Sequence, residues 1–149
     1  MNATKMLLLV AILCFCPAWS VFAVPHTPQA GSDERKAICD AVRARVVSQA
    51  FRKLPQAIVF NVAFLRVDDG FAWFEGTPRF TDGSYVSTDF LADVDYIMVV
   101  QKTNGGWSVK QDLSRGDVPS DTEAKQLRAQ LAHVPTSIMP DSWRRILKQ

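Results

Sequence analysis

Two tight-turn signals constrain the fold of this chain more than any other feature. One is an Asp-Asp-Gly turn at residues 68–70, and the other is an Asn-Gly-Gly turn at 104–106. Both lie between runs rich in β-branched and aromatic residues, and Asp-Gly and Asn-Gly readily adopt the positive φ angles of short hairpin turns. The sequence therefore predicts two antiparallel hairpins, with strands over 56–67, 71–75, 94–103 and 107–113.

Each predicted hairpin carries a further expectation. The sequence Gly-Thr-Pro at 76–78 is expected to end the second strand, and a turn at 81–84 is expected to open a loop that extends to about Asp93. In the last strand Trp107, Val109, Gln111 and Leu113 alternate with polar residues, so we expect these four side chains to share one face.

Helical patterns flank the predicted strands. Ser32 can cap a helix that we expect to run to about Lys53, before Pro55. A capping-box pattern starting at Ser120 predicts a helix over 121–133, and residues 143–147 can add another turn. The expected fold is α+β: a long N-terminal helix packed on a four-stranded antiparallel sheet, with a C-terminal helix, as a single domain over 32–149.

The N-terminal segment has the pattern of an export signal. Lys5 precedes an apolar run, and Val21-Phe22-Ala23 has the small or aliphatic residues of a cleavage site. We expect residues 1–23 to be a signal peptide, residues 24–31 to be a flexible leader and the protein to be periplasmic or secreted, without a membrane segment after cleavage. An uncleaved anchor is the alternative, because the apolar stretch is almost long enough to span a bilayer.

The hairpin residues carry a family resemblance. Residues 59–67 and 70–78, together with Gly105-Gly106-Trp107, resemble a group of small exported bacterial proteins with a leading helix and two such hairpins. The resemblance covers most of residues 33–119 and implies export, but it supplies no residue roles. The order of elements also resembles cystatin-like and NTF2-like folds, which is an analogy of fold alone.

Composition narrows the possible functions. The formal net charge is only +2, and Lys5 of the predicted signal contributes one of these charges, so nucleic-acid binding is not expected. No metal, cofactor or catalytic site is expected, since the two histidines lie far apart and no phosphate-binding or nucleophile motif occurs. Cys39 is the only cysteine after residue 23, and we interpret it as a buried thiol, with a nucleophile or an intermolecular disulfide as alternatives.

Charges separate along the chain, and this pattern gives the leading functional hypothesis. Residues 68–95 are strongly acidic, whereas the first predicted helix is basic. Aromatic side chains beside carboxylates are typical of protein-binding loops, although the same aromatics can instead fold back onto the core. The candidate binding residues are Asp82, Tyr85, Asp89, Phe90 and Asp93.

We therefore expect an exported, non-enzymatic domain that binds a protein partner, such as an inhibitor or immunity protein for a cell-envelope hydrolase or toxin. One alternative is a small-ligand or catalytic pocket between the helix and the sheet, to which Glu75, Tyr96 or Gln111 would contribute. For Glu75 itself, a solvated edge position is the expected outcome. Another alternative is a structural component of the cell envelope.

Overall fold

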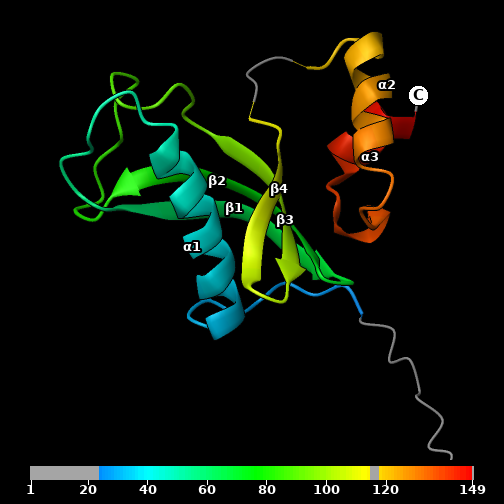
Figure 1. The fold of residues 1–149 in the computed structure, drawn as a ribbon, viewed down its shortest axis with the longest axis horizontal. Coiled ribbons are helices and arrows are strands. Elements are labelled where there is room, and N and C mark those ends of the chain that lie inside the picture. The colour runs from blue at the N-terminus through cyan, green and yellow to red at the C-terminus, as the bar shows by residue number, and fades with distance from the viewer. Residues whose placement is uncertain (1–23, 115–117, 149) are drawn as a thin grey trace, which may run out of the picture.

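The four strands form one antiparallel sheet in the order β1-β2-β3-β4 (Figure 1). The structure is a computed structural model that describes residues 24–114 and 118–148, so the predicted signal peptide at 1–23 lies outside the described residues. Together with three α-helices, the sheet confirms the α+β class. The elements are α1 (Asp33–Ser48), β1 (Ile58–Asp68), β2 (Phe71–Phe80), β3 (Tyr96–Thr103), β4 (Gly106–Asp112), α2 (Asp121–Gln130), the 3₁₀ turn η1 (Thr136–Ile138) and α3 (Asp141–Lys148).

Helix α1 begins as its sequence predicts but ends earlier. The Ser32 hydroxyl accepts a hydrogen bond from the backbone N–H of Arg35, and one face of the helix buries Ile38, Val42 and Val46. The predicted extension to Lys53 is wrong. The backbone N–H of Phe51 donates to the carbonyl of Phe90 at 2.9 Å, so the loop before β3 takes a donor that a longer helix would use.

A bulge in β1 explains why its apolar residues do not alternate simply. Val62 pairs with Gly76 and Phe64 pairs with Glu75, which leaves Ala63 as an extra residue. An extra residue reverses the alternation of side chains between the two faces. As a result, even-numbered residues before the bulge and odd-numbered residues after it pack into the same core beneath α1: Ile58, Phe60, Val62, Leu65 and Val67.

Strand β2 continues through Gly-Thr-Pro to Phe80, so the predicted end of this strand at 76–78 is wrong. Pro78 pairs with Phe60 on β1, but the pairing of β2 with β3 stops at Gly76. The last part of β2 therefore has a neighbouring strand on one side only. A proline is tolerated there because its missing N–H removes no sheet hydrogen bond.

A second irregularity corrects the expectation for β4. Val99 pairs with Gln111 and Val100 pairs with Val109, so Lys110 is extra and the alternation changes phase. Trp107 and Val109 consequently pack in the α1 core, whereas Leu113 packs on the opposite face of the sheet. The four residues predicted to share one face are thus divided by the bulge.

The opposite face of the sheet carries a second core. Trp73 and Val99 are fully buried there against the C-terminal segment, including Ile138 and Trp143. The Trp73 and Trp143 ring centroids lie 5.4 Å apart. In Figure 1, α1 and the α2–α3 pair lie on different sides of the sheet. Helix α2 ends at Gln130 rather than at 133, and the predicted turn at 143–147 is part of α3.

The segment predicted to be a flexible leader is attached to the sheet. His26 forms an isolated antiparallel bridge with Val67, in which each backbone N–H donates to the other's carbonyl. The His26 ring also lies 2.8 Å from the Glu34 carboxylate, and Pro28 is buried. These contacts connect residues 26–28 both to the outer edge of β1 and to the first turn of α1.

Candidate functional site

The loop over residues 81–95 is anchored by its own side chains. Val86 and Leu91 are buried in the α1 core, and the Phe90 ring packs edge-on against Phe80 with centroids 6.3 Å apart. Phe90 therefore folds back on the core, which was the alternative expectation for the aromatics of this loop. The loop is held in place, so residues at its surface are presented without a large ordering cost.

Tyr85 behaves differently from Phe90, because 72% of its surface is exposed. It forms an isolated bridge with Arg79, the carbon of whose guanidinium lies 3.1 Å from the centroid of the Tyr85 ring. Across the sheet Arg79 pairs with Val59, which is 41% exposed. These three side chains form a row on the face of the sheet opposite α1.

A polar row lies beside the first. Asn61 pairs with Thr77, and the Thr77 hydroxyl donates to the carboxylate of Asp95. Asn61 and Asp95 are exposed and Thr77 is half-buried, so the C-terminal helices do not cover this part of the sheet. We call the two rows the open sheet patch, which consists of Val59, Asn61, Thr77, Arg79, Tyr85 and Asp95.

The predicted acidic residues of the loop have different environments. Asp82 is fully exposed, and hydrogen bonds from Ser84 and Gln56 lower its pKa to about 2. Asp89 is exposed, whereas Asp93 is half-buried. Burial, followed by the nearby charge of Asp112, raises the pKa of Asp93. Asp82 is thus a charged surface group at neutral pH and Asp89 is exposed in the same loop, whereas Asp93 is partly withdrawn from solvent.

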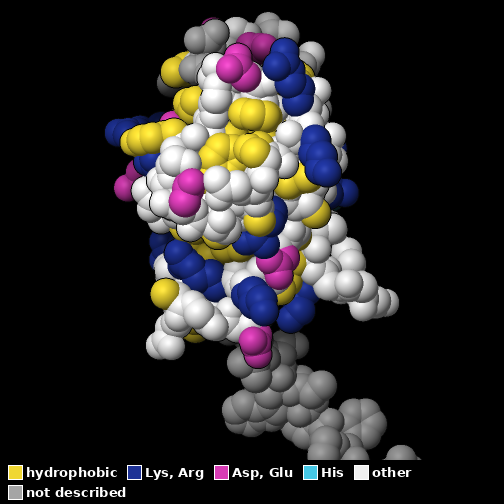
Figure 2. Space-filling view, turned by 90° about the vertical axis from the view of Figure 1, so that its left-hand side faces the viewer, with side chains coloured by type: hydrophobic (Ala, Val, Ile, Leu, Met, Phe, Trp, Pro, Cys, Tyr) yellow, Lys and Arg dark blue, Asp and Glu magenta, His cyan; other side chains and the backbone are white. Residues whose placement is uncertain are grey.

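The acidic loop lies against a basic segment. The hydrogen bond between Phe51 and Phe90 joins the 49–57 loop to the 81–95 loop, and Gln56 donates to Asp82. This brings Arg52 and Lys53, both exposed, to the same end of the molecule, beside Phe51, which is 65% exposed. Figure 2 faces this end and shows apolar side chains among Lys, Arg and a few acidic groups.

The three residues of the alternative pocket do not converge. Tyr96 is buried in the α1 core, and burial is the main cause that raises its pKa to about 12. Glu75 lies on the opposite face of an inner strand, where its carboxylate accepts a hydrogen bond from the Trp73 indole at 3.0 Å. The predicted solvated edge position of Glu75 is therefore wrong. The space between α1 and the sheet is filled by fully buried side chains: Ile38, Val42, Val46, Phe74, Met98 and Val100.

Gln111, the third of these residues, lines a hollow of about 310 Å³ between the end of β4 and helix α2. The Trp143 ring and Leu127 form part of its wall, and most of the remaining lining is polar. The described residues that line it are Gln111, Asp112, Leu113, Val118, Pro119, Glu123, Gln126, Leu127, Gln130 and Trp143.

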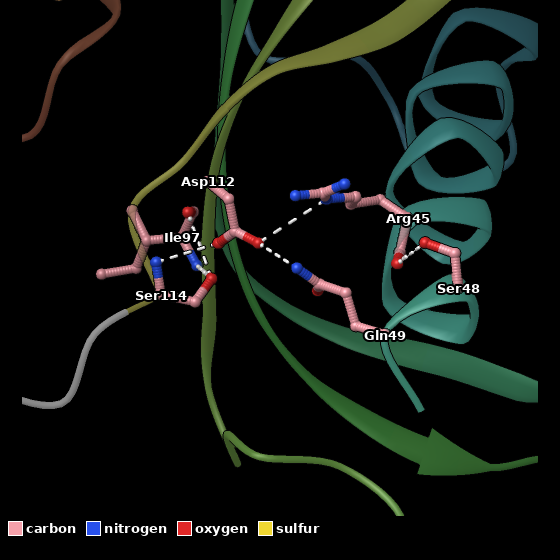
Figure 3. A network of polar contacts seen from close by, with 6 residues as sticks. All are labelled: Arg45, Ser48, Gln49, Ile97, Asp112 and Ser114. Atoms are coloured by element: carbon pink, nitrogen blue, oxygen red, sulfur yellow. Dashed lines mark hydrogen bonds and ion pairs between the residues drawn. The ribbon is translucent and has the colours of Figure 1, made fainter. Parts of the chain in front are cut away.

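A polar network fixes the β4 side of this hollow (Figure 3). One oxygen of the Asp112 carboxylate accepts from the amide of Gln49 at 3.0 Å and lies 3.9 Å from the Arg45 guanidinium. The other oxygen accepts from the backbone N–H of Ser114, whose hydroxyl accepts from the N–H of Ile97. The network ties the end of α1 to the ends of β3 and β4.

The described residues assemble no metal centre. Within 24–114 and 118–148, no group of three or more His, Cys, Asp or Glu side chains could hold a metal ion. Cys39 is half-buried, and burial raises the pKa of its thiol, which disfavours the reactive thiolate. His133 is exposed near the end of α2, far along the chain from Cys39.

Comparison with family models, with curated proteins and with solved structures found no match to this chain. The resemblance to small exported bacterial proteins therefore stays a prediction. Over the residues that the structure describes, no helix has both the length and the apolar character needed to cross a membrane.

Sequence reasoning identified Tyr85 but missed its neighbours on the sheet. The sequence predicts a strand at Val59 but no surface role for it, and it gives no role to Arg79, which lies between the predicted strand end at 76–78 and the predicted turn at 81–84. Their alignment with Tyr85 depends on the continuation of β2 past Pro78, which the sequence argues against. No local signal marks this row, because it depends on the register between β1 and β2.

Proposed function

We propose that this protein is an exported, non-enzymatic domain that binds another protein through the open sheet patch and the adjoining 81–95 loop. The observation that carries the proposal is the exposed Tyr85 ring held over Arg79 on an anchored loop. Tyrosine and arginine are frequent energetic centres of protein interfaces, and a ring that is already fixed loses little conformational entropy on binding.

The charges around this ring suggest the chemistry of the partner. Asp82, Asp89 and Asp95 are exposed, and the loop over 81–95 contains no Lys or Arg. An acidic loop accelerates association with a basic surface. The proposed partner is therefore a basic exported protein, such as a cell-envelope hydrolase or toxin that this domain would inhibit or neutralise.

The first experiment is a capture from exported proteins, with the purified protein as bait and mass spectrometry as the readout. We expect a basic partner in near-equal amount, and binding kinetics with that partner then test the surface. Tyr85→Ala should weaken affinity by about 30-fold, as for a central interface residue. Asp89→Lys should slow association, and the slowing should diminish at high salt.

Lys110→Ala is the matched control, because Lys110 is exposed on β4, far along the sheet from the patch. It should bind as the unaltered protein does. If a partner is captured and Tyr85→Ala, with its fold intact, binds it equally well, the patch is not the interface. If the partner is acidic, the proposed charge complementarity is wrong.

A further inference from the structure

Several polar side chains that line the hollow between β4 and α2 form no hydrogen bonds with other described residues. The side chains of Gln111, Gln126 and Gln130 make no hydrogen bond to any other residue that the structure describes, and all three line the hollow. An amide side chain offers both two donors and an acceptor. The lining therefore holds three groups that can exchange hydrogen bonds with a hydroxyl-bearing ligand.

The charged groups of the lining are already engaged. Asp112 accepts from Gln49 and Ser114 and faces Arg45, as described above. The Glu123 carboxylate accepts from both the backbone N–H and the hydroxyl of Ser120. These two carboxylates disfavour an anionic ligand, while their engagement leaves the glutamines as the groups available for recognition.

An aromatic wall completes the hollow. Trp143 is more than nine-tenths buried, and its indole N–H has no hydrogen-bond partner among the residues that the structure describes. Among the described residues, every side-chain nitrogen or oxygen that is fully buried has a hydrogen-bond partner. Since the Trp143 N–H has none, it must be accessible to solvent. The small exposed part of this indole, beside the amides, can contact an apolar part of a ligand and also donate a hydrogen bond.

We infer that this hollow is a binding site for a neutral saccharide. A sugar ring offers hydroxyls that act as both donors and acceptors, together with a C–H face that packs on an aromatic ring. The volume of about 310 Å³ lies at the lower end of small-molecule sites, which fits one or two sugar rings rather than a long polymer segment. The site is separate from the proposed protein-binding patch.

The inference is tested by two-dimensional ¹⁵N NMR of the purified protein during titration with glucose, N-acetylglucosamine and maltose. We expect saturable shifts of the Trp143 indole signal and of the glutamine side-chain amides, with a Kd on the order of 1 mM for at least one sugar. Gln126→Ala and Gln130→Ala should each weaken binding by about tenfold, because each removes a hydrogen-bonding group from the lining.

Lys125→Ala is the control for these two variants, since it is exposed on the same helix but does not line the hollow. All three substitutions place alanine in a helix, so α2 should persist. Triglycine serves as a neutral peptide probe. The inference is overturned if none of the three sugars gives saturable shifts, or if only triglycine does. If a sugar binds all variants with equal affinity, it binds outside the hollow.

Discussion

Gly76 illustrates how one residue permits the packing around it. A methyl group at this position would lie 2.9 Å from the Phe74 ring and 3.0 Å from the carbonyl oxygen of Asn61. The Phe74 ring is itself fully buried and packs edge-on against Phe60, so it has little room to move. The glycine is therefore required by close approach of its neighbours, not by a turn.

We expect Gly76→Ala to lower the free energy of unfolding by about 1–3 kcal/mol, the usual cost of overpacking a core. Urea denaturation measures the change. Gly105→Ala is the control, because a methyl group there would meet nothing within 4 Å and the backbone angle is not positive. It should change stability by less than about 0.5 kcal/mol. Equal effects of both substitutions would contradict the packing argument.

His26 provides a prediction for pH. The hydrogen bond and the charge of Glu34 raise the pKa of His26 above 6.5, against a smaller opposing effect of burial. A raised pKa means that the contact stabilises the fold fully below pH 6.5, and that this stabilisation is lost as pH rises through the pKa of the folded state. The ring is half-exposed, so the effect on overall stability is small.

Titration of the His26 ring by ¹H NMR should therefore give a midpoint above 6.5 in the unaltered protein. Glu34→Gln should move the midpoint downward, whereas Asp33→Asn, in the same helical turn, should leave it nearly unchanged. A midpoint insensitive to Glu34→Gln would show that the contact between leader and helix is absent in solution.

Among the elements, the strands were predicted better than their ends and faces. The turn residues located both hairpins, because Asp-Gly and Asn-Gly between two β-type runs seldom adopt any structure other than a tight hairpin turn. The bulges at Ala63 and Lys110 were not predictable, since an extra residue leaves no compositional mark and appears only when the partner strand is known. The end of α1 was misplaced for a related reason: the carbonyl that takes the Phe51 N–H belongs to a distant loop.

The C-terminal helices are short, and their stability depends on packing. Helix α3 buries Trp143 and Leu147 against the sheet, where Trp143 packs on Trp73. Trp143→Ala should cost about 3–5 kcal/mol of unfolding free energy, as expected for a buried aromatic residue. Ser142→Ala, exposed in the same turn, should have little effect.

Circular dichroism and tryptophan fluorescence, followed during chemical denaturation, measure this change. We expect the two signals to report one transition in each variant, because the two cores share the same strands. An earlier, separate fluorescence transition in Trp143→Ala would show that the C-terminal segment unfolds on its own, whereas unchanged stability would contradict its docking on the sheet.

As a whole, the protein is a four-stranded sheet with a hydrophobic core on each face. This arrangement decides which parts of the sheet stay exposed to solvent. Helix α1 covers one face, whereas the C-terminal segment of α2, η1 and α3 covers only part of the other. The uncovered part becomes the open sheet patch, and the junction of α2 with β4 becomes the hollow. Both candidate sites are thus consequences of how a short C-terminal segment lies on a longer sheet.

The sequence by itself determined the strand pairs, the capped starts of α1 and α2 and the α+β class, because turns, caps and alternation are encoded by neighbouring residues. Only the tertiary structure decided which faces were covered, which strand edge received His26, and which of the candidate residues came together. Glu75 and Tyr96 belong to opposite faces, while Arg79 and Tyr85 meet across a loop. Such contacts depend on register and packing between distant segments, which local sequence does not specify.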